Sequence, residues 1–195
     1  DASYGRPEDL KALVDTAHEL GLMVLLDVVY NHFGPEGNYL HAFCPQFFNP
    51  KHQTPWGAAI NFDGDAARTV RDFFIHNALY WIEEYRFDGL RLDAIHAIRD
   101  DSALHIVNEI ADALRAGPGR ERHVHLVLEN EANQAHFLAR AASGSPLHAS
   151  AQWNDDLHHA LHVPLTGESD GYYADYADAP LERLGRGLAE GFVYQ

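Results

Sequence analysis

Polar side chains that could act in catalysis follow three short apolar stretches of the chain. They are Asp27, Asn31 and His32 after the first stretch, Arg91, Asp93 and His96 after the second, and Glu129 at the end of the third. Two carboxylates on neighbouring strands can hydrolyse a glycosidic bond when one protonates the leaving oxygen and the other acts on the opposite side of the sugar. The pattern therefore predicts glycoside hydrolysis carried by Asp93 and Glu129.

The order of residues within the second stretch indicates which way its side chains point. Because side chains alternate along a strand, Arg91 and Asp93 share one face while Leu90 and Leu92 share the other. Leucines suit a face covered by helices, which leaves Arg91 and Asp93 pointing into the interior of a barrel. Both lie at the carboxyl end of the strand, where barrel enzymes do their chemistry. We expect Arg91 to keep Asp93 ionised, and we expect the apolar residues before Glu129 to favour its protonated form.

The hydrophobic periodicity predicts helices that alternate with strands. The expected helices are 7–20, 63–85, 101–115, 134–142, 155–162 and 181–189, and the expected strands are 22–29, 89–95, 123–129 and 149–153. Asp63 or Asp65 is expected to cap the second helix, and Asp155 or Asp156 the fifth. The continuous apolar run 22–29 is typical of a strand buried on both faces. Residues 33–62 have no clear period and form a long excursion of the kind that is usually functional.

This alternation predicts an α/β fold with a parallel sheet. A (β/α)8 TIM barrel and a doubly wound sheet both remain open on the pattern alone. No GxGxxG or GxxxxGK[ST] motif follows a strand, so the signatures of dinucleotide and P-loop sites are missing. A complete barrel needs about 250 residues, so the 195 residues would form only part of one.

Composition narrows the classes of partner. The formal net charge of -15 disfavours nucleic acid, because such a surface repels phosphates, but it is compatible with a neutral sugar. No apolar run approaches the ~18 residues of a membrane span, so no membrane partner is expected. Cys44 is the single cysteine, which fits a reducing compartment and leads us to expect a cytoplasmic location.

At these three strand ends the sequence resembles the α-amylase family of glycoside hydrolases. Asp27–His32, Gly89–Ala94 and Leu128–Glu131 are similar to that family's first three signatures, in order and separation. The resemblance implies that residues 1–195 form part of a (β/α)8 catalytic domain, about barrel strands three to six, with the 33–62 excursion after the third. It also implies that the first two barrel strands and an aspartate after the seventh are missing, so that this chain by itself would be inactive.

The resemblance implies a role for each candidate residue. Asp93 would be the nucleophile and Glu129 the general acid/base, with Arg91, His32, His96, Asp27 and Asn31 binding substrate or ordering the site. Glu131 remains an alternative acid, because the third signature departs from its usual wording. No metal and no cofactor is expected. The pair His158 and His162 has the spacing of zinc ligands but lacks further ligands, and the oxygens at 61–65 suit helix capping better than calcium.

Three further stretches, at 31–40, 54–64 and 152–173, resemble one trehalose-releasing subfamily. This implies hydrolysis of the α-1,4 bond next to the terminal trehalose of malto-oligosyl trehalose. The alternatives are another α-glucan enzyme of the family, such as an amylase, a debranching enzyme or a branching enzyme, and a non-catalytic glucan-binding remnant.

Overall fold

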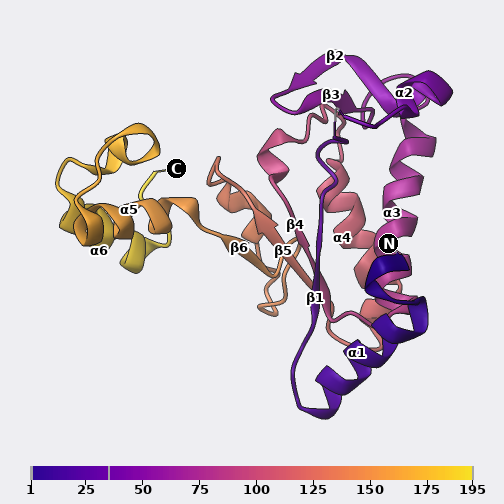
Figure 1. Ribbon diagram of the computed structural model, residues 1–195. Helices are drawn as coiled ribbons and strands as arrows, with labels where there is room; N and C mark the ends of the chain where they lie inside the picture. Colours follow the sequence, from indigo (N-terminus) through magenta and orange to yellow (C-terminus); the bar gives the residue numbers. More distant parts are fainter. Residues whose placement is uncertain (1, 35, 195) are drawn as a thin grey trace.

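A computed structural model of the chain describes residues 2–34 and 36–194 (Figure 1). Its helices and strands, in chain order, are α1 (Pro7–Glu19), β1 (Leu25–Val28), α2 (Leu40–Phe43), β2 (Phe48–Thr54), β3 (Gly57–Ile60), α3 (Ala67–Glu84), β4 (Gly89–Leu92), α4 (Ile106–Ala116), β5 (His125–Glu129), β6 (Ala151–Trp153), α5 (Asp155–Thr166) and α6 (Pro180–Glu190). Short 3-10 helices occupy several connections. Within the described residues, no helix is both long and apolar enough to cross a bilayer.

The main sheet settles which α/β architecture the chain adopts. Its four strands pair in parallel in the order β1-β4-β5-β6, so each strand lies beside the next strand of the same sheet along the chain. Helices α1, α3 and α4 lie on one side of this sheet in Figure 1. A doubly wound sheet reverses its strand order and carries helices on both faces. Sequential strands with helices on one face are instead the arrangement of a (β/α)8 barrel segment.

The core lies between the sheet and these helices. Leu90 and Leu92 of β4 and Leu126 and Leu128 of β5 are buried on the helix-covered face. They pack with apolar side chains of α3 and α4, namely Val70, Phe74, Ala78, Ile82, Ile106, Val107, Ile110 and Leu114. These helical positions recur at spacings of three and four, so they form the single apolar stripe expected of a helix on a sheet. The prediction that Leu90 and Leu92 face the helices is confirmed.

The first predicted strand is wrong in two respects. It is shorter than the predicted 22–29, since only Leu25–Val28 pair with β4. It is also not buried on both faces, because Leu25 and Val29 are 38% and 50% exposed. Within the described residues β1 pairs with β4 alone and helices cover only one of its faces, which leaves these side chains accessible. A continuous apolar run cannot reveal which of its residues will be left at an uncovered face.

The excursion at 33–62 contains secondary structure that the sequence did not indicate. Strands β2 and β3 form an antiparallel hairpin, which stands above the carboxyl ends of β1 and β4 in Figure 1. The predicted cap of α3 is also wrong. The N-cap residue is Ala66, while Asp63 instead accepts hydrogen bonds from Asn49 Nδ2 at 2.6 Å and from the main-chain nitrogen of Asp101 at 3.0 Å. Asp63 therefore fastens the hairpin to the loop after β4.

Three later elements differ from their predicted bounds or caps. Helix α4 begins at Ile106 rather than at residue 101, because the Asp100 carboxylate accepts a hydrogen bond from the Ile106 main chain and holds the preceding loop. The predicted helix 134–142 is a 3-10 helix over Ala135–Leu138. Asn154, and not Asp155 or Asp156, caps α5 through a hydrogen bond from the main-chain nitrogen of Leu157.

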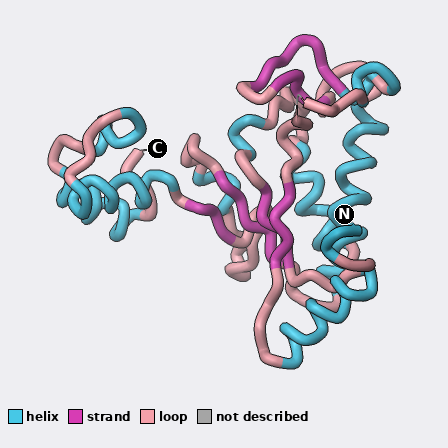
Figure 2. Tube along the Cα trace, in the orientation of Figure 1, coloured by secondary structure: helices cyan, strands magenta, loops and turns pink. Residues whose placement is uncertain are grey.

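Helices α5 and α6 form a separate layer at the other side of the sheet. Figure 2 shows them joined to the sheet through the end of β6. A small second core beside them is made by Ala160 and Val163 of α5, Tyr176, and Val193 of the segment after α6. Asp156 is buried beside this core, where it accepts hydrogen bonds from the main-chain nitrogens of Val193 and Tyr194 at 2.6 and 2.7 Å. One aspartate therefore ties α5 to the segment after α6.

Candidate active site

The charged residues predicted from the strand ends meet on the face of the sheet that the helices leave open. Arg91 of β4 contacts Asp27 of β1 at 2.9 Å, and it contacts Asp93, just beyond β4, at 2.9 Å. It also contacts Glu129 at the end of β5 at 3.1 Å. Since the three strands are neighbours and parallel, their carboxyl ends bring these groups to one edge. A single guanidinium therefore bridges three carboxylates.

The Asp93 carboxylate is held in its ionised form. The main-chain oxygen and the Oδ2 of Asp93 accept hydrogen bonds from the buried Asn31 side chain at 2.7 and 3.1 Å. Partial burial would by itself raise the pKa of Asp93, but hydrogen bonds from Asn31 and Arg91 and the charge of Arg91 outweigh that effect and lower it. An ionised, oriented carboxylate of this kind can act as a nucleophile.

Glu129 lies in a more polar setting than its neighbours along the chain indicate. Its Oε2 accepts a hydrogen bond from the main-chain nitrogen of Ala94 at 2.8 Å and also contacts Arg91. The apolar surroundings expected from Leu126 to Leu128 are therefore wrong. Leu126 and Leu128 point to the helices, so they are part of the core and do not surround the Glu129 carboxylate.

Glu131 occupies a different position from Glu129. Its carboxylate is mostly exposed and faces His96 Nε2 at 3.4 Å. His96 Nδ1 accepts a hydrogen bond from the main-chain nitrogen of Glu131 at 3.2 Å. The shared contact of Glu129 with Arg91 places it, rather than Glu131, beside Asp93.

His32 and Asp27 lie at the margin of the site. The His32 ring stacks on Trp56, with ring centroids 5.0 Å apart, and hydrogen-bonds the neighbouring Asn31. Asp27 has a side chain that is 60% exposed and contacts Arg91. Trp56 was missed by sequence reasoning, because it sits in the turn of the β2–β3 hairpin, which has no periodic signal.

A cavity of about 380 Å³ joins the two candidate catalytic carboxylates to helix α5. It is lined by Trp56, Asp93, Ala94, His96, Glu129, Glu131, Asp155, His158, His159 and Tyr172. The residues from α5 onward were not predicted as site residues, because only the path of the chain after β6 brings them across from Asp93. Aromatic rings and carboxylates around one cavity suit a sugar, which offers both apolar faces and hydroxyl groups.

The two histidines considered as zinc ligands from the sequence lie close together on α5. Their ring centroids are 6.2 Å apart, and His162 Nε2 pairs with Glu168 at 2.6 Å. Among the described residues, one group could bring three ligand atoms together, namely His52, Asp63 and Asp101. His52 and Asp63 already pair at 2.9 Å, and Asp63 accepts two further hydrogen bonds. These contacts account for the group without an ion.

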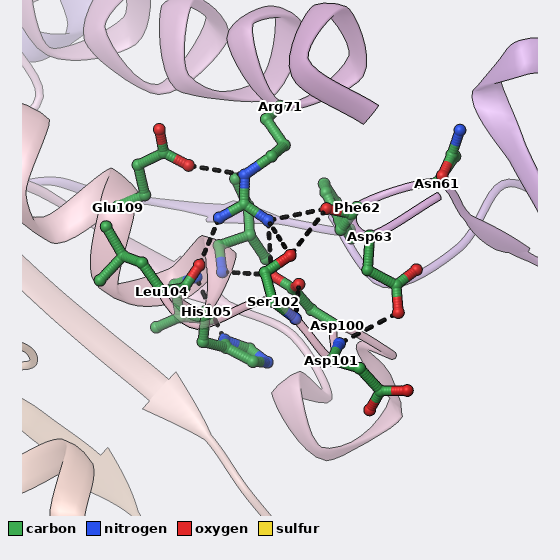
Figure 3. A network of polar contacts seen from close by, with 12 residues as sticks. Asn61, Phe62, Asp63, Arg71, Asp100, Asp101, Ser102, Leu104, His105 and Glu109 are labelled. Atoms are coloured by element: carbon green, nitrogen blue, oxygen red, sulfur yellow. Dashed lines mark hydrogen bonds and ion pairs between the residues drawn. The ribbon is translucent and has the colours of Figure 1, made fainter. Parts of the chain in front are cut away.

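A buried arginine holds the loops that surround the cavity (Figure 3). Arg71 of α3 contacts Asp100 at 2.7 Å and Glu109 at 2.6 Å. It also donates hydrogen bonds to the main-chain oxygens of Phe62 at 2.8 Å and Leu104 at 2.5 Å. The base of the hairpin, the loop after β4 and helix α4 are therefore fixed to one side chain, which positions the elements that carry Trp56 and His96.

Comparisons with known proteins show that the chain is similar to members of the α-amylase family. Residues 1–78 match the family model of the α-amylase catalytic domain. A malto-oligosyltrehalose trehalohydrolase from Saccharolobus solfataricus is 45% identical over 89% of this chain and 30% of its own length. The enzyme of the same name from Deinococcus radiodurans is 43% identical over 99% of this chain and 29% of its own length. The chain thus spans about a third of the length of the curated relatives it matches.

A solved structure gives the same result for the fold. A protein from Salmonella typhimurium that was assigned as an α-amylase superposes with a TM-score of 0.92 and 48% sequence identity. That match covers 98% of this chain and 32% of the other. The parallel strand order described above is therefore that of part of an α-amylase catalytic domain.

Proposed function

Because this chain is part of an α-amylase-family catalytic domain, we propose that its strand-end carboxylates carry out retaining hydrolysis of an α-glucan. Asp93 attacks the anomeric carbon and Glu129 protonates the leaving glycosidic oxygen. The same Glu129 then removes a proton from the water that releases the sugar from Asp93. No organic cofactor takes part in these steps.

The observation that carries the proposal is the bridge made by Arg91. Both Asp93 and Glu129 contact the same guanidinium group, at 2.9 and 3.1 Å. One guanidinium thus holds both carboxyl groups at the same edge of the sheet, and we propose that they work at the separation of a retaining enzyme, about 5–5.5 Å. An inverting enzyme needs about 6.5–9.5 Å to leave room for a water molecule between the two groups.

The two carboxylates have surroundings that suit different roles. Asp93 has donors on both oxygens and a lowered pKa, which keeps it an anion ready to attack. Glu129 must carry a proton in the first step, so its contact with Arg91 must weaken when the leaving oxygen takes its place beside the carboxyl group. Apo sites commonly reach catalytic geometry only when substrate is bound.

For the substrate we propose malto-oligosyl trehalose, cleaved at the α-1,4 bond next to the terminal trehalose. Support comes from the relatives at 40–46% identity, several of which are named malto-oligosyltrehalose trehalohydrolase. The cavity beside Asp93, with Trp56 and Tyr172 in its lining, is suited to hold sugar rings. The proposal concerns the whole protein that carries this chain.

The test is the release of free trehalose from maltotriosyl trehalose by that whole protein. A Glu129→Gln variant removes the acid, so its rate should fall by about 10²–10⁴-fold. Glu131→Gln serves as the matched control and should keep a rate within about tenfold of the parent, because its carboxylate faces His96 rather than Arg91.

Three outcomes would change the proposal. Glucose or maltose without trehalose would keep the mechanism and replace the substrate with that of an amylase. Equal losses in both variants, or a larger loss in Glu131→Gln, would move the acid to Glu131. Tight glucan binding by the parent without turnover would show a binding protein instead of an enzyme.

A further inference from the structure

Trp153 contacts the arginine on which the proposed chemistry depends. It is the last residue of β6 and lies opposite Glu129 in the sheet register. Its ring lies over the guanidinium of Arg91, with the Arg91 Cζ 4.3 Å from the ring centroid. Arg91 therefore extends from β4 across β5 to meet a side chain from the second strand away.

The contact completes the surroundings of a guanidinium that is otherwise held only at its two terminal nitrogens. Nη1 bonds to Asp27 and Asp93, and Nη2 contacts Glu129. Arg91 Nε is buried and has no hydrogen-bond partner among the described residues. These contacts are made at the edge of the guanidinium, so its flat face remains available to pack against the Trp153 ring. An indole ring is the aromatic surface that attracts a cation most strongly.

We infer that Trp153 is a positioning residue that holds the Arg91 guanidinium in the plane from which it reaches Asp93 and Glu129 together. This inference rests on the proposed function, since it concerns the same two carboxylates. Trp153 is a member of neither apolar core of the described residues, and the side-chain contact of its ring is with Arg91.

Without the Trp153 ring, the Arg91 guanidinium would be free to move toward Asp27. Asp27 lies on β1, on the opposite side of β4 from Glu129. The Asp93 carboxylate would then lose part of the positive charge that holds its pKa down. Other charged groups around the cavity would remain as they are, namely His96 and Glu131 beyond β4 and β5, and Asp155, His158 and His159 of α5. A change in the ionisation of Asp93 would therefore report on Arg91.

The first experiment compares the pH dependence of kcat/KM for the whole protein and its Trp153→Leu variant. Loss of a cation–π contact should move the acid limb of the profile to higher pH by about 0.5–1 unit and lower kcat about three- to tenfold. Trp153→Phe keeps an aromatic face and should return the limb toward the parent. Trp56→Leu is the matched control, because Trp56 stacks on His32, and it should raise KM without moving the limb.

The second experiment needs no catalysis. The difference in unfolding free energy between the protein and its Asp93→Asn variant, measured from pH 3 to 7, follows the ionisation of Asp93 in the folded state. Trp153→Leu should shift this titration to higher pH. If the parent cleaves no α-glucan, the proposed function has failed, while this titration still decides the role of Trp153.

Two results would overturn the inference. One is an active, folded Trp153→Leu variant in which neither the acid limb nor the Asp93 titration moves. The other is a rise in KM alone, which would make Trp153 a substrate contact. Trp153→Met provides a second aliphatic replacement if the leucine variant does not fold.

Discussion

At the scale of single residues, Arg91 is the side chain that joins the parts of the candidate active site. It is a partly buried cation whose charge is compensated by Asp27, Asp93 and Glu129 from three strands. Removing one partner from such a group leaves the other charges without compensation, which costs far more than the loss of an exposed pair. The same network therefore organises the site and favours the ionised form of Asp93, the proposed nucleophile.

Replacement of Arg91 should change the pH range of activity. Catalysis needs the Asp93 anion, and the pKa of that carboxyl is held below its ordinary value, so the parent should keep activity into acid solution. Arg91→Met removes the charge and should move the acid limb of kcat/KM to higher pH. Asp27→Asn is the control and should leave the limb in place, because Arg91 keeps its contacts with Asp93 and Glu129. Steady-state kinetics from pH 3 to 7 would measure both, and a limb that moves only in Asp27→Asn would refute the assignment.

At the scale of elements, the sequence predicts the orientation of side chains correctly where the pattern within one stretch determines it. Leu90 and Leu92 alternate with Arg91 and Asp93, so the two faces of β4 could be predicted and are confirmed. The β2–β3 hairpin could not be predicted, because its strands carry no alternating pattern and Asn49 and Asp63 hold it by polar contacts with distant partners. The residues that close the cavity from α5 were missed for the same reason, since chain path and not local pattern brings them there.

The polar hub at Arg71 gives a test at this scale. Arg71→Met leaves the buried Asp100 carboxylate without its cation and leaves Glu109 paired only with the exposed Arg68, which should lower the free energy of unfolding by about 3–5 kcal/mol. Arg68→Met is the matched control, since Arg68 lies on the same helix and also pairs with Glu109 but is 56% exposed. Its loss should stay below about 1 kcal/mol. Urea unfolding would measure the difference, and equal losses would contradict the role of Arg71.

At the scale of the whole molecule, the described chain has two cores of unequal size. The large one lies under the sheet and contains Leu90 and Leu128, and the small one lies between α5 and the segment that follows α6. The active-site cavity is lined from both sides, by Asp93 and Glu129 on the sheet and by His159 and Tyr172 beyond it. The position of α5 should therefore affect substrate binding.

Loosening of the small core should be local. Asp156→Ala leaves the main-chain nitrogens of Val193 and Tyr194 and the Tyr176 hydroxyl without their acceptor. Each unsatisfied buried group costs about 1–3 kcal/mol. Hydrogen exchange should become faster in α5 and α6 while the amides of β4 and β5 remain protected. Faster exchange spread evenly over both cores would mean that they unfold as one unit.

The central claim is that Asp93 forms a covalent bond to the sugar. The most direct measurement is mass spectrometry of peptides from the whole protein after reaction with a fluorinated α-glucosyl fluoride, in the Glu129→Gln background that slows release of the intermediate. The account predicts a glycosyl ester on the peptide that carries Asp93 and no label after Asp93→Asn. A label on another carboxylate, or unlabelled protein that still hydrolyses the glucan with inversion at the anomeric carbon, would contradict it.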